Sequence, residues 1–297
     1  MVLGSFFYKH RAKQALKGNW QTALLVTFFA SIFLTIAQVW QSTAMRDIEA
    51  VINSLAAALN TMPEGITAES VQFQEIRELY QRLFAAITAI PDATYYGLIA
   101  ANLLALVITP ALSIGSSRYF IARIDGQELG LKEGLLGRIR IWHRALWLYV
   151  LMGIKVLLWS LLFVIPGVVA AIRYSMAPYF LAEDSSITAR EAICKSKEAM
   201  NGQKMGYFML QLSFVGWNLL ITLVQLLLVD ISVVVSLVAA QFISLAVSAY
   251  MMASNAAFYR AVSKPDGMQE LVNNMRSSMQ QMGMELPEEN DDGGEDE

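Results

Sequence analysis

Three charged side chains interrupt apolar stretches of the chain: Lys155, Arg173 and Asp230. Lys155 lies eleven residues before Pro166 and Arg173 seven residues after it, about 16 Å and about 10 Å from a turn at Pro166 on straight helices. A charge at the centre of a bilayer costs about 2.5 to 3.5 kcal/mol on insertion scales, so each needs a partner or a water-filled cavity. The three charges therefore predict either a polar site for a substrate or an ion, or a purely structural arrangement.

The structural interpretation is the favoured one. In it, the Lys155 side chain extends to the membrane surface, and Arg173 bonds helix carbonyls or pairs with Asp230 near a second outer turn. No intramembrane acid is expected near the bilayer centre, where a proton relay with the two cations would need one. A cavity between helix hairpins that binds a substrate or an ion remains the alternative.

The composition excludes most soluble classes of protein. Of 297 residues, 56% are hydrophobic and only 16% are charged, far from the roughly 25% charged residues of a soluble domain. Seven acids crowd into residues 288–297, so the rest of the chain carries a net charge of +4. Such an acidic end is expected to be solvated and disordered. The chain as a whole is expected to meet lipid.

No motif for catalysis is present in the sequence. A phosphate-binding glycine loop, a His-Glu-x-x-His pair and a Gly-x-Ser-x-Gly elbow are all missing. The single cysteine, Cys194, and two histidines, His10 and His143, form no metal-ligand pattern. We therefore expect no catalytic, cofactor-binding or metal-binding residue, and an enzyme is the least favoured class. Nucleic-acid binding is not expected either, because the basic residues are dispersed along membrane edges, where anionic lipid explains them.

Six apolar stretches predict an all-α, polytopic membrane helical bundle, since about 20 helical residues cross a hydrocarbon core of about 30 Å. Residues 205–259 carry only Asp230 as a charge and would form a helix of about 80 Å, so they must contain two crossings. Residues 145–182, about 57 Å as one helix, divide at Pro166-Gly167 in the same way. The predicted transmembrane helices, paired in three hairpins, are residues 20–40, 97–117, 145–165, 166–182, 205–229 and 231–259. The first is expected to be a retained anchor, because it is too long for a signal peptide.

Lysine and arginine predict the orientation, because they accumulate in short cytoplasmic segments. Residues 1–19 and 183–204 each hold four such residues, and 118–144 hold six, whereas 41–96 hold three against seven acids. We expect a bacterial plasma membrane protein with both termini cytoplasmic. The expected cytoplasmic segments are an interfacial helix (1–19), a basic loop (118–144), an amphipathic helix (183–204) and a tail (260–297). A five-helix alternative would put 183–204 outside, which its basic density opposes.

The external segment, residues 41–96, carries two apolar stripes with helical spacing. They comprise Met45, Ile48, Ile52, Leu55 and Leu59, and then Phe73, Ile76, Tyr80, Leu83, Ile87 and Ile90. The connection between them contains Pro63 and Gly65, and Pro91 separates the second stripe from the membrane. An external helical hairpin is favoured over a mobile insert.

A short pattern precedes each predicted hairpin: KQALKGN at 13–19, KEGLLGR at 132–138 and KEAMNGQ at 197–203. It predicts a short basic helix stopped by a glycine. Thr188 and Glu191 have the spacing of a capping box at the start of the last copy. Internal repeats and convergent use of lysine and glycine at a membrane edge explain the pattern equally well.

Longer stretches resemble the bacterial integral membrane family catalogued as domain of unknown function 975. The resemblance lies in RYSMAPYFLAED (173–184), ITAREAICKSKEAMNGQKMGYFMLQLSFVGW (187–217) and SNAAFYR (254–260). It covers nearly the whole chain apart from the outer loop, is concentrated after residue 165, and implies a multi-pass membrane protein without implying a catalytic residue. The motif residues are Arg173, Tyr174, Ser175, Ser196, Met200, Gly202, Leu212, Ser213, Phe214, Gly216 and Trp217. The chain departs from the family at Ala249-Tyr250, where the resemblance implies a Pro-Tyr pair, and this departure removes the reason for a bend in the last helix.

The expected partner besides the lipid bilayer is a membrane or cytoplasmic protein. In the tail, Met268, Leu271, Met275, Met279 and Met282 form one helical stripe, and methionine adapts to irregular surfaces. Packing of this helix under the protein's own cytoplasmic edge is an equal alternative. The expected function is membrane organisation or regulation without catalysis, and the alternative is a transporter or export component with a polar site between hairpins.

Overall fold

The computed structural model describes residues 4–60, 71–88, 92–229 and 233–264, and these residues contain helices and connections but no strand. The predicted methionine-rich helix and acidic end of the tail, the connection around Pro63 and Gly65, and Asp230 all lie outside the described residues. The helices are α1 (Ser5–Leu16), α2 (Trp20–Asn60), α3 (Val71–Thr88), α4 (Asp92–Ile124), α5 (Leu131–Leu136), the short 3-10 helix η1 (Ile139–Ile141), α6 (Trp142–Leu162), α7 (Val164–Tyr174), α8 (Ala177–Glu183), α9 (Ala189–Ala199), α10 (Lys204–Val229) and α11 (Val233–Ser263).

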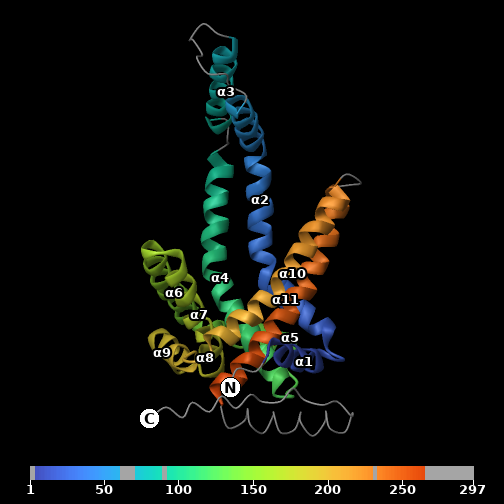
Figure 1. Ribbon diagram of the computed structural model, residues 1–297, viewed down its shortest axis with the longest axis vertical. Coiled ribbons are helices and arrows are strands. Elements are labelled where there is room, and N and C mark those ends of the chain that lie inside the picture. Colours follow the sequence, from blue (N-terminus) through green and yellow to red (C-terminus); the bar gives the residue numbers. More distant parts are fainter. Residues whose placement is uncertain (1–3, 61–70, 89–91, 230–232, 265–297) are drawn as a thin grey trace, which may run out of the picture.

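The long helices form three pairs that share one end of the molecule (Figure 1). We call these pairs arm one (α2 with α4), arm two (α6 with α7) and arm three (α10 with α11). We call the shared end, which also contains α1, α5, α8 and α9, the base. The arms diverge as they leave the base, and α3 packs against the far end of α2.

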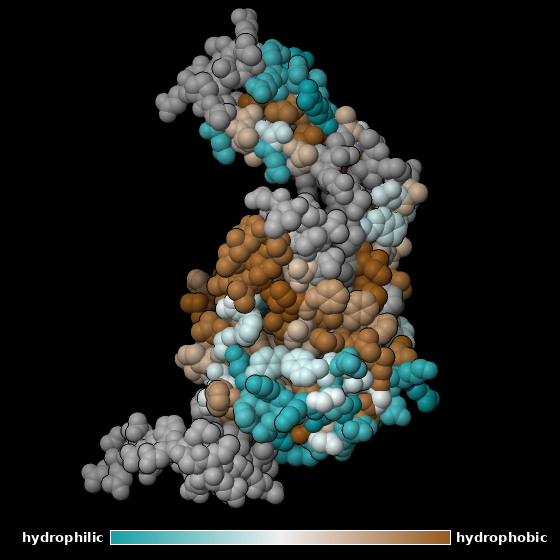
Figure 2. All heavy atoms as spheres, turned by 90° about the vertical axis from the view of Figure 1, so that its right-hand side faces the viewer, coloured by the Kyte–Doolittle hydropathy of each residue, from teal (hydrophilic) through white to brown (hydrophobic). Residues whose placement is uncertain are grey.

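Five helical stretches among the described residues are long and apolar enough to cross a membrane: 93–124, 131–162, 164–183, 204–228 and 239–263. The predicted crossing at 20–40 lies in α2. Within it, the described side chains cover Trp20–Ile32, an apolar stretch shorter than a full crossing. On the face shown in Figure 2, apolar surface covers the middle of the molecule, with hydrophilic surface at the base and at the α3 end. This is the surface of a helical membrane protein.

Helix α2 differs from the expectation of a crossing followed by a separate external helix. It continues from Trp20 to Asn60 without a break, because this stretch contains no proline or glycine to end it. Of the predicted external stripes, Leu55 and Ile76 are buried, whereas Leu59, Tyr80 and Ile87 are exposed. The helices predicted in this segment are therefore present but bury only part of their predicted apolar faces.

The turn of arm two falls at Phe163, three residues before the predicted Pro166. Phe163 has an extended conformation (φ −160°, ψ 154°), and Pro166 lies in the first turn of α7, where its missing N–H needs no partner. Gly167 then allows the two helices to touch, since a Cβ atom at this position would lie 2.1 Å from the Ser160 hydroxyl oxygen.

The hydrophobic core of the protein sits at the base rather than along the arms. Tyr8, Phe120, Phe258 and Tyr259 are all fully buried there. Tyr8 of α1 packs edge-on against Phe258 of α11, with ring centroids 5.0 Å apart. Helix α1, which the sequence predicts to be interfacial, thus packs one face against α11.

Candidate functional site

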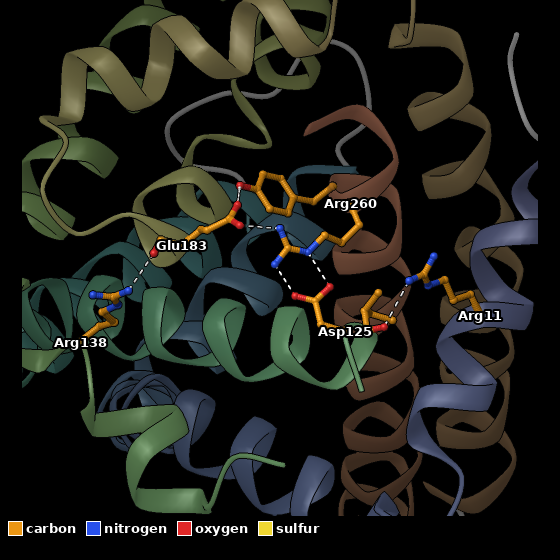
Figure 3. Close-up of polar contacts among 7 residues, drawn as sticks. Arg11, Asp125, Arg138, Glu183 and Arg260 are labelled. Carbon is orange, nitrogen blue, oxygen red and sulfur yellow. Dashed lines mark hydrogen bonds and ion pairs between the residues drawn. The ribbon is translucent and has the colours of Figure 1, made fainter. Parts of the chain in front are cut away.

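Arg260, in the last turn of α11, joins the three arms at the base (Figure 3). Its Nε donates to an Asp125 carboxylate oxygen at 2.8 Å and its Nη2 donates to the other oxygen. Its Nη1 donates to Glu183 Oε1 at 2.6 Å, and the Tyr259 hydroxyl donates to the second oxygen of Glu183. Asp125 follows α4 of arm one, Glu183 ends α8, which continues α7 of arm two, and Arg260 belongs to α11 of arm three. One guanidinium therefore connects the base ends of all three arms. We call these four residues the junction.

The Arg260 guanidinium is well suited to this position. Its side chain is only 10% exposed, and its planar array of donors can bind two carboxylates at once. Residues 118, 121, 122 and 125 follow helical spacing on α4, and all four line the same cavity as Arg260. The junction therefore has a walled space beside it, bounded by one face of α4.

Two further arginines fix the end of α8. Arg138 donates from Nε to the Ala182 carbonyl at 3.0 Å and from Nη2 to the Glu183 carbonyl at 2.9 Å. Arg144 donates to the Ser185 carbonyl at 2.7 Å. The last carbonyls of a helix lack intrahelical hydrogen-bond donors and carry partial negative charge. Arginine side chains at this position supply the donors and a compensating positive charge.

Helix α1 supplies cations to the other side of the junction. Arg11 donates to the Ile124 carbonyl at the end of α4 at 3.3 Å, and burial lowers its pKa, an effect opposed by the nearby Asp125. Lys9 donates to the Ser213 carbonyl at 3.2 Å and lies 4.5 Å from the centroid of the Phe214 ring. The Tyr250 hydroxyl in turn donates to the Lys9 carbonyl at 3.1 Å.

Ser196 of α9 bridges the break between α7 and α8. Its hydroxyl donates to the Arg173 carbonyl at 2.9 Å and accepts from the Met176 N–H at 3.2 Å. The predicted crossing at 166–182 is thus two helices, whose free backbone groups are satisfied by a buried side chain from a third. The Thr188 and Glu191 capping box, predicted from the sequence, starts α9.

Two of the three predicted polar residues, Lys155 and Arg173, lie in arm two. The Lys155 ammonium lies 5.6 Å from the centroid of the Tyr174 ring, a distance that permits a cation–π interaction. Arg173 is half-buried, and its Nε is buried without a hydrogen-bond acceptor among the described residues. The predicted pair of Arg173 with Asp230 stays a prediction, because Asp230 lies outside them.

The motif residues fall into two groups. Tyr174, Ser196, Met200 and Phe214 are buried at the base, and Gly202 has the left-handed conformation expected of a helix-stopping glycine (φ +75°). Ser175 and Ser213 are half-buried, whereas Leu212 and Trp217 are exposed on α10. A Cβ atom placed at Gly216 would meet no heavy atom within 4 Å, apart from its chain neighbours and the nearby backbone of its own helix. Within the described residues, no close contact therefore requires glycine at this position.

The glycine pattern before each hairpin is matched in two of its three copies. Gly18 (φ +82°) and Gly202 (φ +75°) are left-handed, whereas Gly137 is right-handed (φ −61°). The left-handed glycine of the middle segment is Gly126, which follows Asp125. Helix α11 runs unbroken through Ala249 and Tyr250, where the chain lacks the proline of the family pattern.

Sequence reasoning missed the junction because its charges seemed to belong to separate surface segments. Asp125 follows a helix end, Glu183 precedes a loop, and Arg260 closes the SNAAFYR motif. The buried Tyr259 beside Arg260 was the available signal, because a tyrosine hydroxyl usually finds a partner when buried. Among the described residues, no group of three or more His, Cys, Asp or Glu side chains is arranged to hold a metal ion.

The apolar helices and their charged base define the class of the protein, an all-helical membrane protein. The model of the family "Protein of unknown function (DUF975)" matches residues 161–266, a segment that contains all three motif stretches. The resemblance expected from the sequence is thereby confirmed over this segment, which runs from the end of α6 through α11. No curated protein and no solved structure matches the chain.

Proposed function

We propose that this chain is a non-enzymatic, membrane-organising protein of the bacterial plasma membrane, with six crossings in three hairpins. Its base would fix the hairpins relative to one another, while their apolar flanks receive the helices of other membrane proteins. The observation that carries the proposal is the Arg260 junction, which joins three arms at the base (Figure 3).

The far halves of arms two and three support this role. Leu157, Leu158, Leu161 and Leu162 of α6 are all exposed, Leu161 by 75%. Neighbouring positions on a helix point in different directions, so this end of α6 has little protein around it. Leu219, Leu223, Leu226 and Leu227 repeat this exposure on α10. Apolar surface of this kind faces lipid or partner helices, since helices associate in a bilayer mainly by packing and hydrogen bonding.

The charge distribution supports a cytoplasmic base. Arg11, Arg138, Arg144 and Arg190 all belong to base elements or to the first turn of α6, and cytoplasmic segments are enriched in such residues. With the base inside, both termini are cytoplasmic and α3 lies outside.

A transporter or export component is the second candidate. Its support is the buried Arg173 Nε, which lacks an acceptor among the described residues, and the nearby contact of Lys155 with Tyr174. A water-filled path would give these cations a function in binding a substrate or an ion.

Two experiments separate the candidates. For the first, a photo-reactive amino acid is placed at Leu161, with the buried Leu148 as control. Organisation by contact predicts a discrete adduct with another membrane protein at Leu161 and only internal products at Leu148. Adducts with lipid alone at both Leu161 and Leu226 would exclude organisation by contact.

In the second experiment, cysteines are scanned through residues 150–180 in a Cys194→Ser background. Continuous labelling by a water-soluble reagent along one face would establish the transport path instead.

A further inference from the structure

We propose that the cavity between Arg118 and Arg138, beside the junction, binds a phosphate group. The cavity has a volume of about 200 Å³, enough for several water molecules at ~30 Å³ each and therefore for a phosphate group. Three arginines and two carboxylates supply its charged lining: Arg118, Arg138, Arg260, Asp125 and Glu183. This phosphate site does not depend on the proposed membrane-organising function, because it would be present even if no other membrane protein packed against the arms.

The two carboxylates do not serve the other two guanidinium groups. Both oxygens of Asp125 accept from Arg260, and the oxygens of Glu183 accept from Arg260 and from the Tyr259 hydroxyl. Three of the five N–H groups of Arg260 are thereby engaged by the acids that surround it. The cavity retains an excess of positive charge on the side of Arg118 and Arg138.

Within the described part of the chain, the hydrogen-bond donors of the Arg118 guanidinium are free to bind a ligand. None of the described residues accepts a hydrogen bond or forms an ion pair with its side chain, although it is half-buried. A Cβ atom at Gly137 would lie 3.0 Å from Arg118 Nη1, so the guanidinium packs closely over this glycine. Its five N–H donors belong to a rigid planar group that lines the cavity without an acceptor from the described chain.

Arg138 lies close enough to Arg118 for the two cations to repel each other. Its Nε and Nη2 are occupied by the Ala182 and Glu183 carbonyls, whereas Nη1 has no acceptor among the described residues. Asp184 also lies near Arg138, but one of its oxygens accepts from the backbone and hydroxyl of Ser186. An anion between the two guanidinium groups would remove the repulsion and supply the missing acceptors.

Phosphate fits this geometry better than a carboxylate. One arginine can satisfy a carboxylate by itself, as Arg260 does for Asp125, whereas two separate guanidinium groups suit an anion with three terminal oxygens. A phosphate monoester also carries more than one negative charge at neutral pH, which matches two cations. The phosphate could belong to an anionic phospholipid headgroup at the membrane edge or to a soluble molecule.

Thermal unfolding of the full-length, delipidated protein in detergent tests the proposal. The soluble probes are inorganic phosphate and glycerol 3-phosphate at constant ionic strength, with chloride as the reference. The lipid probe is phosphatidylcholine with or without phosphatidic acid, added in mixed detergent micelles, and its effect is read from the same thermal unfolding. We expect wild type to respond to at least one phosphate probe, and Arg118→Gln to weaken that binding about tenfold or more, since charged hydrogen bonds are lost.

Two control variants show whether a loss of phosphate binding is specific to Arg118. Arg190→Gln removes one exposed arginine from the base outside this cavity and should bind as wild type does. Arg118→Lys keeps the charge but not the planar donors, and should be intermediate if Arg118→Gln fails to fold. A response to the soluble probes identifies a soluble ligand, and a response to phosphatidic acid alone identifies a lipid. No response to any probe, or equal losses in Arg118→Gln and Arg190→Gln, would overturn the proposal.

Discussion

Arg260 and Asp125 are 135 positions apart in the chain, yet two N–H groups of the arginine bind the two oxygens of the aspartate. This contact fixes the last turn of α11 to the residue that follows α4. Because the same guanidinium also binds Glu183, a single side chain adds a charged link to the direct packing of α4 against α8 and α11.

Replacing Arg260 by methionine should lower the free energy of unfolding by about 1.5 to 3 kcal/mol, because two carboxylates, 27% and 35% exposed, lose their charged hydrogen bonds. Chemical denaturation in detergent measures the loss. The control is Arg82→Met, which removes an i,i+4 pair whose Arg82 side chain is 69% exposed and should cost less than about 1 kcal/mol. Equal losses in the two variants would contradict the junction.

Ser196→Ala should destabilise the protein by about 2 kcal/mol, since it removes one acceptor and one donor from the buried α7–α8 break. Hydrogen exchange should rise at Met176, whose N–H loses its acceptor. Cys194→Ser, an exposed change on the same helix, serves as the control and should leave both quantities unchanged. A Ser196→Ala protein with the stability and exchange of the control would show that the backbone does not need this hydroxyl.

Gly167→Ala should separate the helices of arm two, because the new methyl group would lie 2.1 Å from the Ser160 hydroxyl oxygen and 3.0 Å from its Cα. Overpacking of this kind costs about 1 to 3 kcal/mol. Gly153→Ala lies in the same arm and meets no atom within 4 Å, so it should be neutral. Thermal unfolding should show a lower midpoint for Gly167→Ala than for Gly153→Ala. Equal midpoints would rule out a close helix contact at Gly167.

The start of α9 should depend on pH through Glu191. The Thr188 backbone N–H and side chain bind the Glu191 carboxylate and lower its pKa from 4.5. The contribution to stability is therefore fully present above pH 4.5 and is lost as pH falls through the lowered pKa. Hydrogen exchange in α9 should rise over this acidic range in wild type. Glu191→Gln should remove that pH dependence, and an unchanged profile in the variant would assign the effect to another group.

Reporter fusions after Ser117, Gly202 and Ser263 should be cytoplasmic, and a fusion at Gly65 should be external. The reason is the concentration of lysine and arginine on the base side of the chain. Alkaline phosphatase and a cytoplasmic fluorescent protein report the two sides independently. An external Gly202 fusion is the informative failure, because it would mean that α6 and α7 make a single crossing.

The helical class and most helix positions could be predicted, because apolar length and breaking residues act locally. Two boundaries differed for local reasons as well: α2 has no residue to stop it after Trp40, and Pro166 fits inside a first helical turn instead of forming the turn itself. The sequence indicated the capping box of α9 because its residues are three positions apart.

The junction could not be predicted, because its members are separated by 58 and 77 positions, from Asp125 to Glu183 and from Glu183 to Arg260. Each charge alone is compatible with a solvated helix end. Only the packing of α4, α8 and α11 makes them one site. The same holds for Ser196, since a serine within a helix shows no sign in the sequence of which distant backbone break it will satisfy.

The position of Arg260 near the end of the chain sets an order for biogenesis. During synthesis α4 and α8 emerge and enter the membrane before the residue that neutralises Asp125 and Glu183 has been translated. The two carboxylates must therefore stay hydrated, or bind temporary counter-ions, until α11 has been inserted. The contacts of α11 with α1, α2 and α4 therefore form last, whereas α4 can pack against α6 and α8 before α11 has been translated.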